Sequence, residues 1–236
     1  MTNTSGGAIQ SPIHLQRRIL SFLEEIASSG KYQKLCDIGC GNGEFTLKVA
    51  NVLGAKEIYG LDKETPKNVH KKGVKLFQCD VENEKIPLPD NFFDIVLAVE
   101  VVEHLRWPDS LLSEVRRILK KDGLFLVSTP NMLWWFNRIS MLLGYMPRFS
   151  EASLRYPYLS QFLEGKLSYC TPAGHVKLYS HGLLTKLLEK YGFNAIETVG
   201  LNFDIKDGHL LLQIDKMMTK INKKWAAHLI VSARKT

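Results

Sequence analysis

Over residues 32–130, two patterns of apolar and polar positions alternate along the chain. A run of a few apolar residues is typical of a buried strand, and apolar residues every three or four positions are typical of an amphipathic helix. Such segments alternate here, which predicts an α/β fold with a parallel sheet and helices on both faces. The predicted strands are residues 35–38, 57–61, 74–78, 93–99 and 124–128.

The same reasoning extends to both ends of the chain. Proline favours the first helical position, so a helix is expected to begin at Ser11-Pro12 and to end near Ser28-Ser29-Gly30. Pro108 opens another helix over 109–121, which Gly123 is expected to stop. The remaining predicted elements are a helix over 181–191 capped by Ser180, a strand over 193–199, a helix over 210–223 and a strand over 228–233.

Residues 131–177 interrupt the alternation and carry many aromatic side chains, among them Trp134, Trp135 and Tyr145. They follow the fifth predicted strand, at the edge of the sheet where ligands of such sheets bind. We interpret this cap segment as a cover over a ligand pocket. Two alternatives stay open: the aromatic residues cover core, or residues 134–146 make weak contact with a membrane surface.

The first apolar run leads into three alternating glycines, Gly39, Gly41 and Gly43. Glycine has no Cβ, so a ligand can approach this backbone closely, and free N–H groups at the start of the next helix would face it. The second run ends on Asp62, at a spacing suited to binding ribose hydroxyls. Nicotinamide-dependent oxidoreductases share both features, although the further glycine or alanine of their motif is missing here.

Five motifs occur in order over the predicted sheet: Asp37-Ile-Gly-Cys-Gly-Asn-Gly43, Gly60-Leu-Asp62, Cys79-Asp80-Val81, Phe93-Asp-Ile-Val-Leu-Ala-Val-Glu100 and Glu103-His104-Leu105. As a set, they resemble the class I S-adenosylmethionine-dependent methyltransferases of the type 11 and type 23 group, which contains quinone-biosynthetic enzymes. The resemblance implies a Rossmann-like, seven-stranded, mostly parallel sheet with an antiparallel last strand and a helical, aromatic cap after the fifth strand.

The resemblance also implies how S-adenosylmethionine would be bound and converted to S-adenosylhomocysteine. It assigns Asp37 and the glycines Gly39, Gly41 and Gly43 to the methionine end, and Asp62 to the ribose hydroxyls. It assigns Asp80 and Val81 to the adenine edge, and Glu100 to the wall near the methionine moiety. Aromatic faces of Trp134, Trp135 or Tyr145 would add cation–π stabilisation of the sulfonium.

An oxygen acceptor needs a base to take its proton, and histidine titrates near neutral pH. His104 and His175 are the candidates on the ligand side, each with a structural role as the alternative. We expect O-methylation of a small-molecule or lipid- or glycan-linked acceptor. A protein that binds an adenosine ligand without catalysis stays open as an alternative.

Composition and charge bear on the binding partners and on the number of domains. The 236 residues carry 31 Lys and Arg against 24 Asp and Glu, a net charge of +7, in scattered clusters without a nucleic-acid module. This favours a solvated basic surface over nucleic-acid binding.

No Pro/Gly/Ser-rich linker divides the chain, so we expect one methyltransferase domain, with an N-terminal helix (1–31), a cofactor-binding half (32–130), the cap segment (131–177) and the rest of the sheet (178–236).

The cysteines Cys36, Cys40, Cys79 and Cys170 show neither C-x-x-C spacing nor neighbouring histidine clusters. We therefore expect no metal site and no disulfide, and a reducing, cytoplasmic location. No signal-peptide pattern is evident at the N-terminus, and no apolar run approaches the ~20 residues that span a bilayer.

Overall fold

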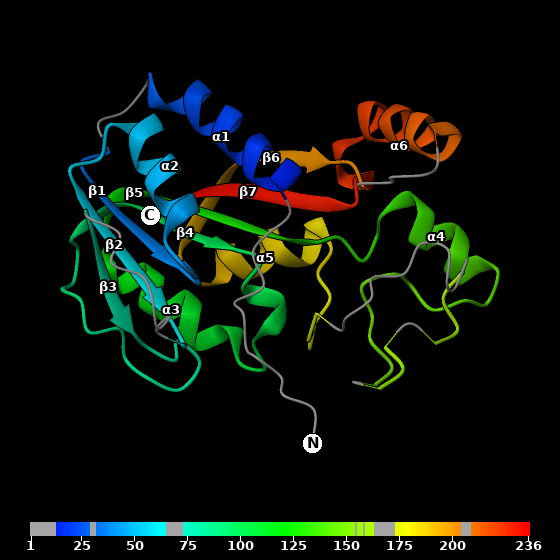
Figure 1. Cartoon of the computed structure of the whole chain (residues 1–236), viewed down its shortest axis with the longest axis horizontal. Coiled ribbons are helices and arrows are strands. Elements are labelled where there is room, and N and C mark those ends of the chain that lie inside the picture. Colours follow the sequence, from blue (N-terminus) through cyan, green and yellow to red (C-terminus); the bar gives the residue numbers. More distant parts are fainter. Residues whose placement is uncertain are drawn as a thin grey trace.

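The computed structural model describes residues 13–28, 32–64, 73–153, 155–157, 159–162, 173–203 and 209–236. Its centre is a seven-stranded sheet of order β3-β2-β1-β4-β5-β7-β6 (Figure 1). Strands β1 to β5 are parallel, and β7 runs antiparallel between β5 and β6, as expected. The strands are β1 (Lys34–Ile38), β2 (Glu57–Asp62), β3 (Val74–Gln78), β4 (Phe93–Val99), β5 (Leu119–Pro130), β6 (Phe193–Leu201) and β7 (His228–Lys235).

Helices cover both faces of the sheet because successive strand residues point to opposite faces. Leu35 and Leu97 pack with α1 (Ile13–Ala27) and α2 (Glu44–Leu53). Cys36 and Val96, one position along, point to the other face and pack with α3 (Pro108–Ile118) and α5 (His181–Lys190). The predicted start of α1 at Ser11-Pro12 and its end at Ser29-Gly30 lie outside the described residues.

The helix predicted over 109–121 is shorter than expected. It ends at Ile118, and β5 begins at Leu119, with a register shift against β4. The expectation that Gly123 stops this helix was therefore wrong. Gly123 lies in the irregular start of the strand, where an added Cβ would come within 2.8 Å of the Lys120 carbonyl oxygen.

The cap segment forms α4 (Trp135–Leu142), which packs with α6 (His209–Ile221) beside one end of the sheet (Figure 1). Asp215 of α6 is fully buried where this helix meets the cap segment. It accepts hydrogen bonds from the indole nitrogens of Trp134 (2.6 Å) and Trp135 (2.5 Å) and from the Phe203 amide (2.8 Å). One carboxylate therefore joins the cap segment, about 80 residues away in the sequence, to α6 and to Phe203.

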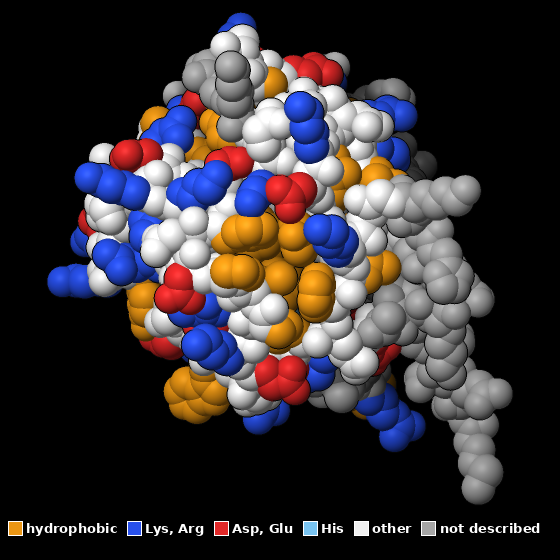
Figure 2. All heavy atoms as spheres, turned by 90° about the vertical axis from the view of Figure 1, so that its left-hand side faces the viewer, with side chains coloured by type: hydrophobic (Ala, Val, Ile, Leu, Met, Phe, Trp, Pro, Cys, Tyr) orange, Lys and Arg blue, Asp and Glu red, His pale blue; other side chains and the backbone are white. Residues whose placement is uncertain are grey.

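Charged side chains are mixed on the face shown in Figure 2. Lys and Arg side chains surround a hydrophobic patch and alternate with Asp and Glu, so this face carries no continuous basic groove among the described residues.

Two short 3₁₀ turns, Val102–His104 and Lys223–Trp225, complete the described elements. None of the described helices has the length and apolar character needed to cross a membrane.

Candidate active site

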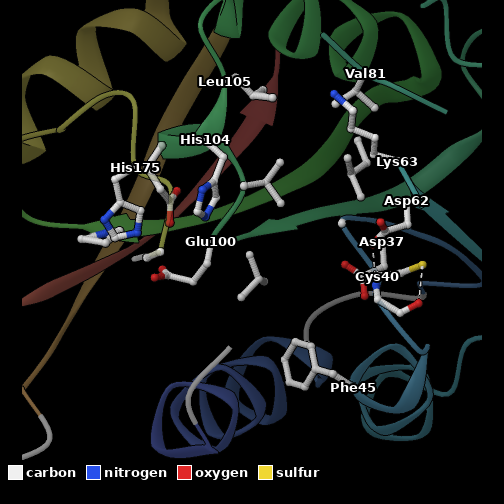
Figure 3. A pocket seen from close by; sticks show the side chains of 18 of the residues that line it. Asp37, Cys40, Phe45, Asp62, Lys63, Val81, Glu100, His104, Leu105 and His175 are labelled. Atoms are coloured by element: carbon white, nitrogen blue, oxygen red, sulfur yellow. Dashed lines mark hydrogen bonds between the residues drawn. The ribbon is translucent and has the colours of Figure 1, made fainter. Parts of the chain in front are cut away.

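A cavity of about 1010 Å³ lies at the carboxyl ends of the parallel strands. This is the edge where doubly wound sheets bind ligands, and the strand order reverses here between β1 and β4. The cavity is lined at one end by the glycine loop and strand-end carboxyl groups, and at the other by Glu100, His104 and His175 (Figure 3). We call these the donor end and the acceptor end.

The glycine loop at the donor end depends on left-handed backbone. Gly39, Gly41 and Gly43 have φ of 75°, 52° and 75°, a region that favours glycine. At Gly39 space is also short, because an added Cβ would lie 2.5 Å from Cγ2 of Val101. The loop therefore needs glycine both for its conformation and for the close packing of the turn after β4.

Several amides of the glycine loop donate hydrogen bonds within the protein. The amides of Gly39 and Cys40 donate to the Leu61 carbonyl at 2.8 and 3.1 Å, and that of Gly43 donates to the Cys40 carbonyl at 2.9 Å. Free N–H groups were expected at the start of α2, and there the Gly43 amide is engaged and the Glu44 amide donates to Asn42 Oδ1 at 3.0 Å. The expectation is therefore wrong for these two amides. Because its glycines have no Cβ, the loop still lets a ligand approach the backbone closely, beside the carboxylates at the strand ends.

Asp62 ends β2 and turns toward the glycine loop. Its Oδ2 accepts the Gly41 amide at 2.8 Å, and its Oδ1 accepts the Glu64 amide at 3.1 Å. A carboxylate offers about four lone-pair directions, so both oxygens can still accept a ligand hydroxyl. The geometry is consistent with the ribose-binding role expected for Asp62.

Asp80, beyond the end of β3, is held by its neighbours. Its carboxylate accepts the Glu82 amide at 3.2 Å and the Asn83 side chain at 3.1 Å, and pairs with Lys63 at 2.9 Å. The Lys63 hydrogen bond is the main reason that the pKa of Asp80 is lowered. Asp80 and Val81 both line the cavity, and Asp80 also closes its own turn.

Asp37, in β1, is 3% exposed and lines the floor of the donor end. Its Oδ2 accepts the Thr46 hydroxyl of α2 at 2.5 Å. Burial raises the pKa of Asp37 to about 7, with a smaller upward effect from Asp62 and an opposing effect from Thr46. This carboxyl therefore titrates near neutral pH, where a nearby cation would favour its ionised form.

Glu100 adopts left-handed backbone, with φ of 55°, directly after β4. The Ser128 hydroxyl of β5 accepts the Glu100 amide at 3.1 Å and donates to Oε1 at 2.9 Å. Nδ1 of His228, at the start of β7, lies 3.4 Å from Oε2. Burial alone would raise the pKa of Glu100, but His228 and Ser128 outweigh it and lower the pKa.

His104 and His175 are neighbours at the acceptor end, with ring centroids 5.1 Å apart (Figure 3). Nδ1 of His104 is 3.1 Å from the Gly174 carbonyl, and Nδ1 of His175 is 3.0 Å from the Phe149 carbonyl. A carbonyl only accepts, so each Nδ1 carries a proton, and in the neutral ring Nε2 is the nitrogen that keeps a lone pair. Burial is the main cause of the lowered pKa of His175.

The aromatic residues of the cap segment do not line the cavity as expected. Trp134 and Trp135 pack in the cluster around Asp215, and Tyr145 is 41% exposed. The role proposed for these three rings beside the sulfonium was wrong. The cap segment instead lines the acceptor end with Arg148, Phe149, Glu151, Gln161, Ala173 and His175.

Glu103, His228 and Arg148 were not singled out from the sequence as site residues, yet all three line the cavity. Burial first, and then the charge of Glu100, raise the pKa of Glu103 well above its ordinary value. The spacing of Glu100, Glu103 and His104 is a local signal that could have found Glu103. No local signal marks His228, because the sheet order alone brings it to Glu100.

A sheet of this order, with a glycine loop and a strand-end acid at its carboxyl edge, is typical of the class I S-adenosylmethionine-dependent methyltransferases. A family model described as a methyltransferase domain, Methyltransf_23, matches residues 13–198. The chain belongs to this family, and it is an S-adenosylmethionine-dependent methyltransferase. The methyl donor is S-adenosylmethionine.

Curated relatives agree with this class. The chain is 25% identical over 204 residues to a probable S-adenosylmethionine-dependent methyltransferase of Mycolicibacterium smegmatis, covering 82% of this chain and 67% of that protein. It is 35% identical over 105 residues to the ubiquinone biosynthesis O-methyltransferase of Cereibacter sphaeroides, covering 42% of this chain and 41% of the relative. The chain thus spans less than half of that relative's length.

Solved structures share the fold. One is the 1,6-didemethyltoxoflavin-N1-methyltransferase of Burkholderia thailandensis, solved with 1,6-didemethyltoxoflavin and S-adenosylhomocysteine bound. It has a TM-score of 0.57 and 18% identity, covering 94% of this chain and 78% of that chain. At this identity the likeness concerns the fold.

Proposed function

We propose that this methyltransferase methylates an oxygen atom of a small or lipid- or glycan-linked acceptor bound at the acceptor end. One observation carries the proposal: a single cavity joins the glycine loop and Asp62 at one end to the unprotonated Nε2 atoms of His104 and His175 at the other. The name of the O-methyltransferase relative supports oxygen as the target atom.

In this proposal the parts of the cofactor lie along the donor end in the order in which the strands end: adenine beside β3, ribose beside β2 and methionine beside β1. Asp80 and Val81 contact the adenine edge, and Asp62 accepts the ribose hydroxyls. Gly39, Gly41 and Gly43 face the methionine end with Asp37, and Glu100 forms the wall between donor and acceptor. The reactive methyl group would then point toward the histidine pair.

Methyl transfer at this point is an in-line displacement. The acceptor oxygen forms a bond to the methyl carbon while the carbon–sulfur bond breaks. Its electron pair stays on sulfur and leaves neutral S-adenosylhomocysteine. The hydroxyl proton must depart, and we propose that this happens beside His104 and His175. Holding oxygen and methyl at attack distance in a closed pocket supplies most of the acceleration.

The lining favours a polar acceptor. Arg148 is 2% exposed and Gln161 is equally buried, and both belong to the cavity wall with His228. Such polar groups fix the orientation of a ligand that can form hydrogen bonds with them. The acceptor we expect is therefore a hydroxylated molecule, whose apolar tail, if present, would extend beyond this end.

Addition of S-adenosylmethionine should stabilise the protein, whereas NAD should not. At a ligand concentration of 100 times the dissociation constant, binding adds about 2.7 kcal/mol to the free energy of unfolding. This raises the melting temperature of a chain of this size by about 5–10 °C. Thermal-shift measurement with each ligand checks this. A larger shift with NAD would support the oxidoreductase alternative, and a panel of hydroxylated acceptors with no S-adenosylhomocysteine formation would support a non-catalytic binder.

Affinity for S-adenosylmethionine should fall as the pH drops from 7.5 to 5.5, by on the order of 10-fold. The pKa of Asp37 is about 7, so the carboxylate that favours the cationic ligand is progressively protonated over this range. Calorimetric titration at each pH measures the effect. Asp37→Asn should bind more weakly with a flatter pH dependence, and an unchanged slope in this variant would contradict the assignment.

We also propose a reducing compartment, the cytoplasm. Cys36, Cys40 and Cys79 are free thiols buried in or beside the strands, where they act as small apolar residues. Burial is the main reason that the pKa of the Cys36 thiol is raised well above its ordinary value. Unreactive buried thiols are consistent with the packing role predicted from the sequence.

A further inference from the structure

Three potential ligand groups meet at the acceptor end. One ligand atom each of Glu103, His104 and His175 lies within 4.8 Å of the others. His104 and Glu103 belong to the same 3₁₀ turn, and His175 comes from the far end of the cap segment. The Glu103 carbonyl accepts the amides of Val176 (2.8 Å) and Lys177 (3.0 Å), which fastens the His175 segment to that turn.

The carboxyl group of Glu103 is fully buried, and neither of its oxygens forms a hydrogen bond of ordinary geometry; its nearest polar side chains are Thr129 and Glu100. A buried polar group without a well-formed hydrogen bond destabilises the fold, and more so if it is charged. The fold therefore keeps a buried carboxyl beside two imidazoles and gives it no well-formed hydrogen bond, with only the Thr129 hydroxyl as a weak donor nearby. A bound cation is the kind of partner that would offset this cost.

The histidines are arranged as metal ligands usually are. In metal sites the second ring nitrogen commonly donates to a carbonyl or carboxylate, which fixes the tautomer and aims the free nitrogen at the ion. The Gly174 and Phe149 carbonyls serve that purpose for His104 and His175. Glu151 in turn holds the Gly174 amide at 3.0 Å, so the supporting backbone is itself fixed.

We propose that Glu103, His104 and His175 bind one divalent transition-metal ion at the acceptor end. Two imidazoles and a carboxylate suit first-row ions such as Mn²⁺, Co²⁺ and Zn²⁺, and three protein ligands leave positions open for a substrate. Glu100 is already engaged by Ser128 and His228 and adds negative charge nearby. This proposal replaces the expectation of no metal site.

The role of the ion rests on the proposed function. An acceptor hydroxyl bound to the ion becomes more acidic, since a divalent cation stabilises the oxyanion. Its proton passes to solvent, and the oxygen lone pair then attacks the methyl carbon as described above. With the ion bound, the nitrogens of His104 and His175 serve as its ligands, and this replaces the role of base expected for them from the sequence. An acceptor with two adjacent oxygens would bind best to an ion that accepts five or six ligands, because both oxygens can then ligate it.

Titration of the full-length, chelator-treated protein with Co²⁺ tests the site, with calorimetry and visible absorption as readouts. We expect one site, and at least about 100-fold weaker binding in Glu103→Gln, His104→Ala and His175→Ala, since loss of supporting groups alone costs 10- to 100-fold. His181→Ala is the matched control, because His181 contacts Thr198 on β6 and does not line the cavity. Circular dichroism checks that each variant is folded.

Two outcomes would overturn the proposal: no Co²⁺ binding to the unaltered protein, or equal binding in the folded Glu103→Gln variant. The proposed function is tested separately, by S-adenosylmethionine binding to the chelator-treated protein. That binding should persist without metal, since the donor end has its own ligands. Its absence would count against the donor assignment whatever the Co²⁺ result.

Discussion

Asp62→Ala should weaken S-adenosylmethionine binding about 10- to 150-fold. Charge-assisted hydrogen bonds contribute about 1.5–3 kcal/mol, and loss of this amount changes a dissociation constant by that factor. The carboxylate is already directed at the glycine loop through the Gly41 amide, so it needs no rearrangement to reach a ribose. Calorimetric titration of the purified variant measures the change.

Asp62→Asn separates the ligand contact from the support of the loop. Its amide oxygen can still accept from Gly41, but the side chain has lost its charge and half its acceptors. We expect affinity between those of Asp62→Ala and the unaltered protein. Asp109→Asn on α3 is the control, because Asp109 accepts the Tyr191 hydroxyl outside the cavity. An unchanged dissociation constant in Asp62→Ala would show that the ribose lies elsewhere.

Asp215→Ala should lower the free energy of unfolding by about 3–5 kcal/mol. The substitution leaves three buried donors, two indole nitrogens and the Phe203 amide, without their acceptor. Trp134 is fully buried, so water cannot readily replace the lost oxygen. Urea unfolding followed by tryptophan fluorescence measures the loss directly at these rings.

The neighbouring Lys216→Ala provides the control for α6. Lys216 is exposed, and a surface substitution there should change stability by no more than about 0.5 kcal/mol. Since Asp215 does not line the cavity, the folded Asp215→Ala protein should bind S-adenosylmethionine nearly as well as the unaltered chain. Equal urea midpoints for Asp215→Ala and Lys216→Ala would mean that the carboxylate does not hold the cluster together.

The sequence alone determined the sheet and the donor end. Short apolar runs and helical periods are local patterns, and each element forms largely from its own residues. Gly39, Gly41 and Gly43 follow one strand and Asp62 ends the next, so the parallel arrangement of β1 and β2 is enough to bring them together. The resemblance to methyltransferases rested on the same local motifs, and the antiparallel β7 agrees with it.

Tertiary structure alone decided the acceptor end. The aromatic residues of the cap segment were expected to face the ligand, but Asp215, 80 positions from Trp135, draws both indoles into a separate cluster. His228 reaches Glu100 because β7 lies beside β5, and His175 reaches Glu103 because the cap segment returns to the sheet. Such pairings depend on which surfaces the whole chain must bury, and no local period of the sequence encodes that.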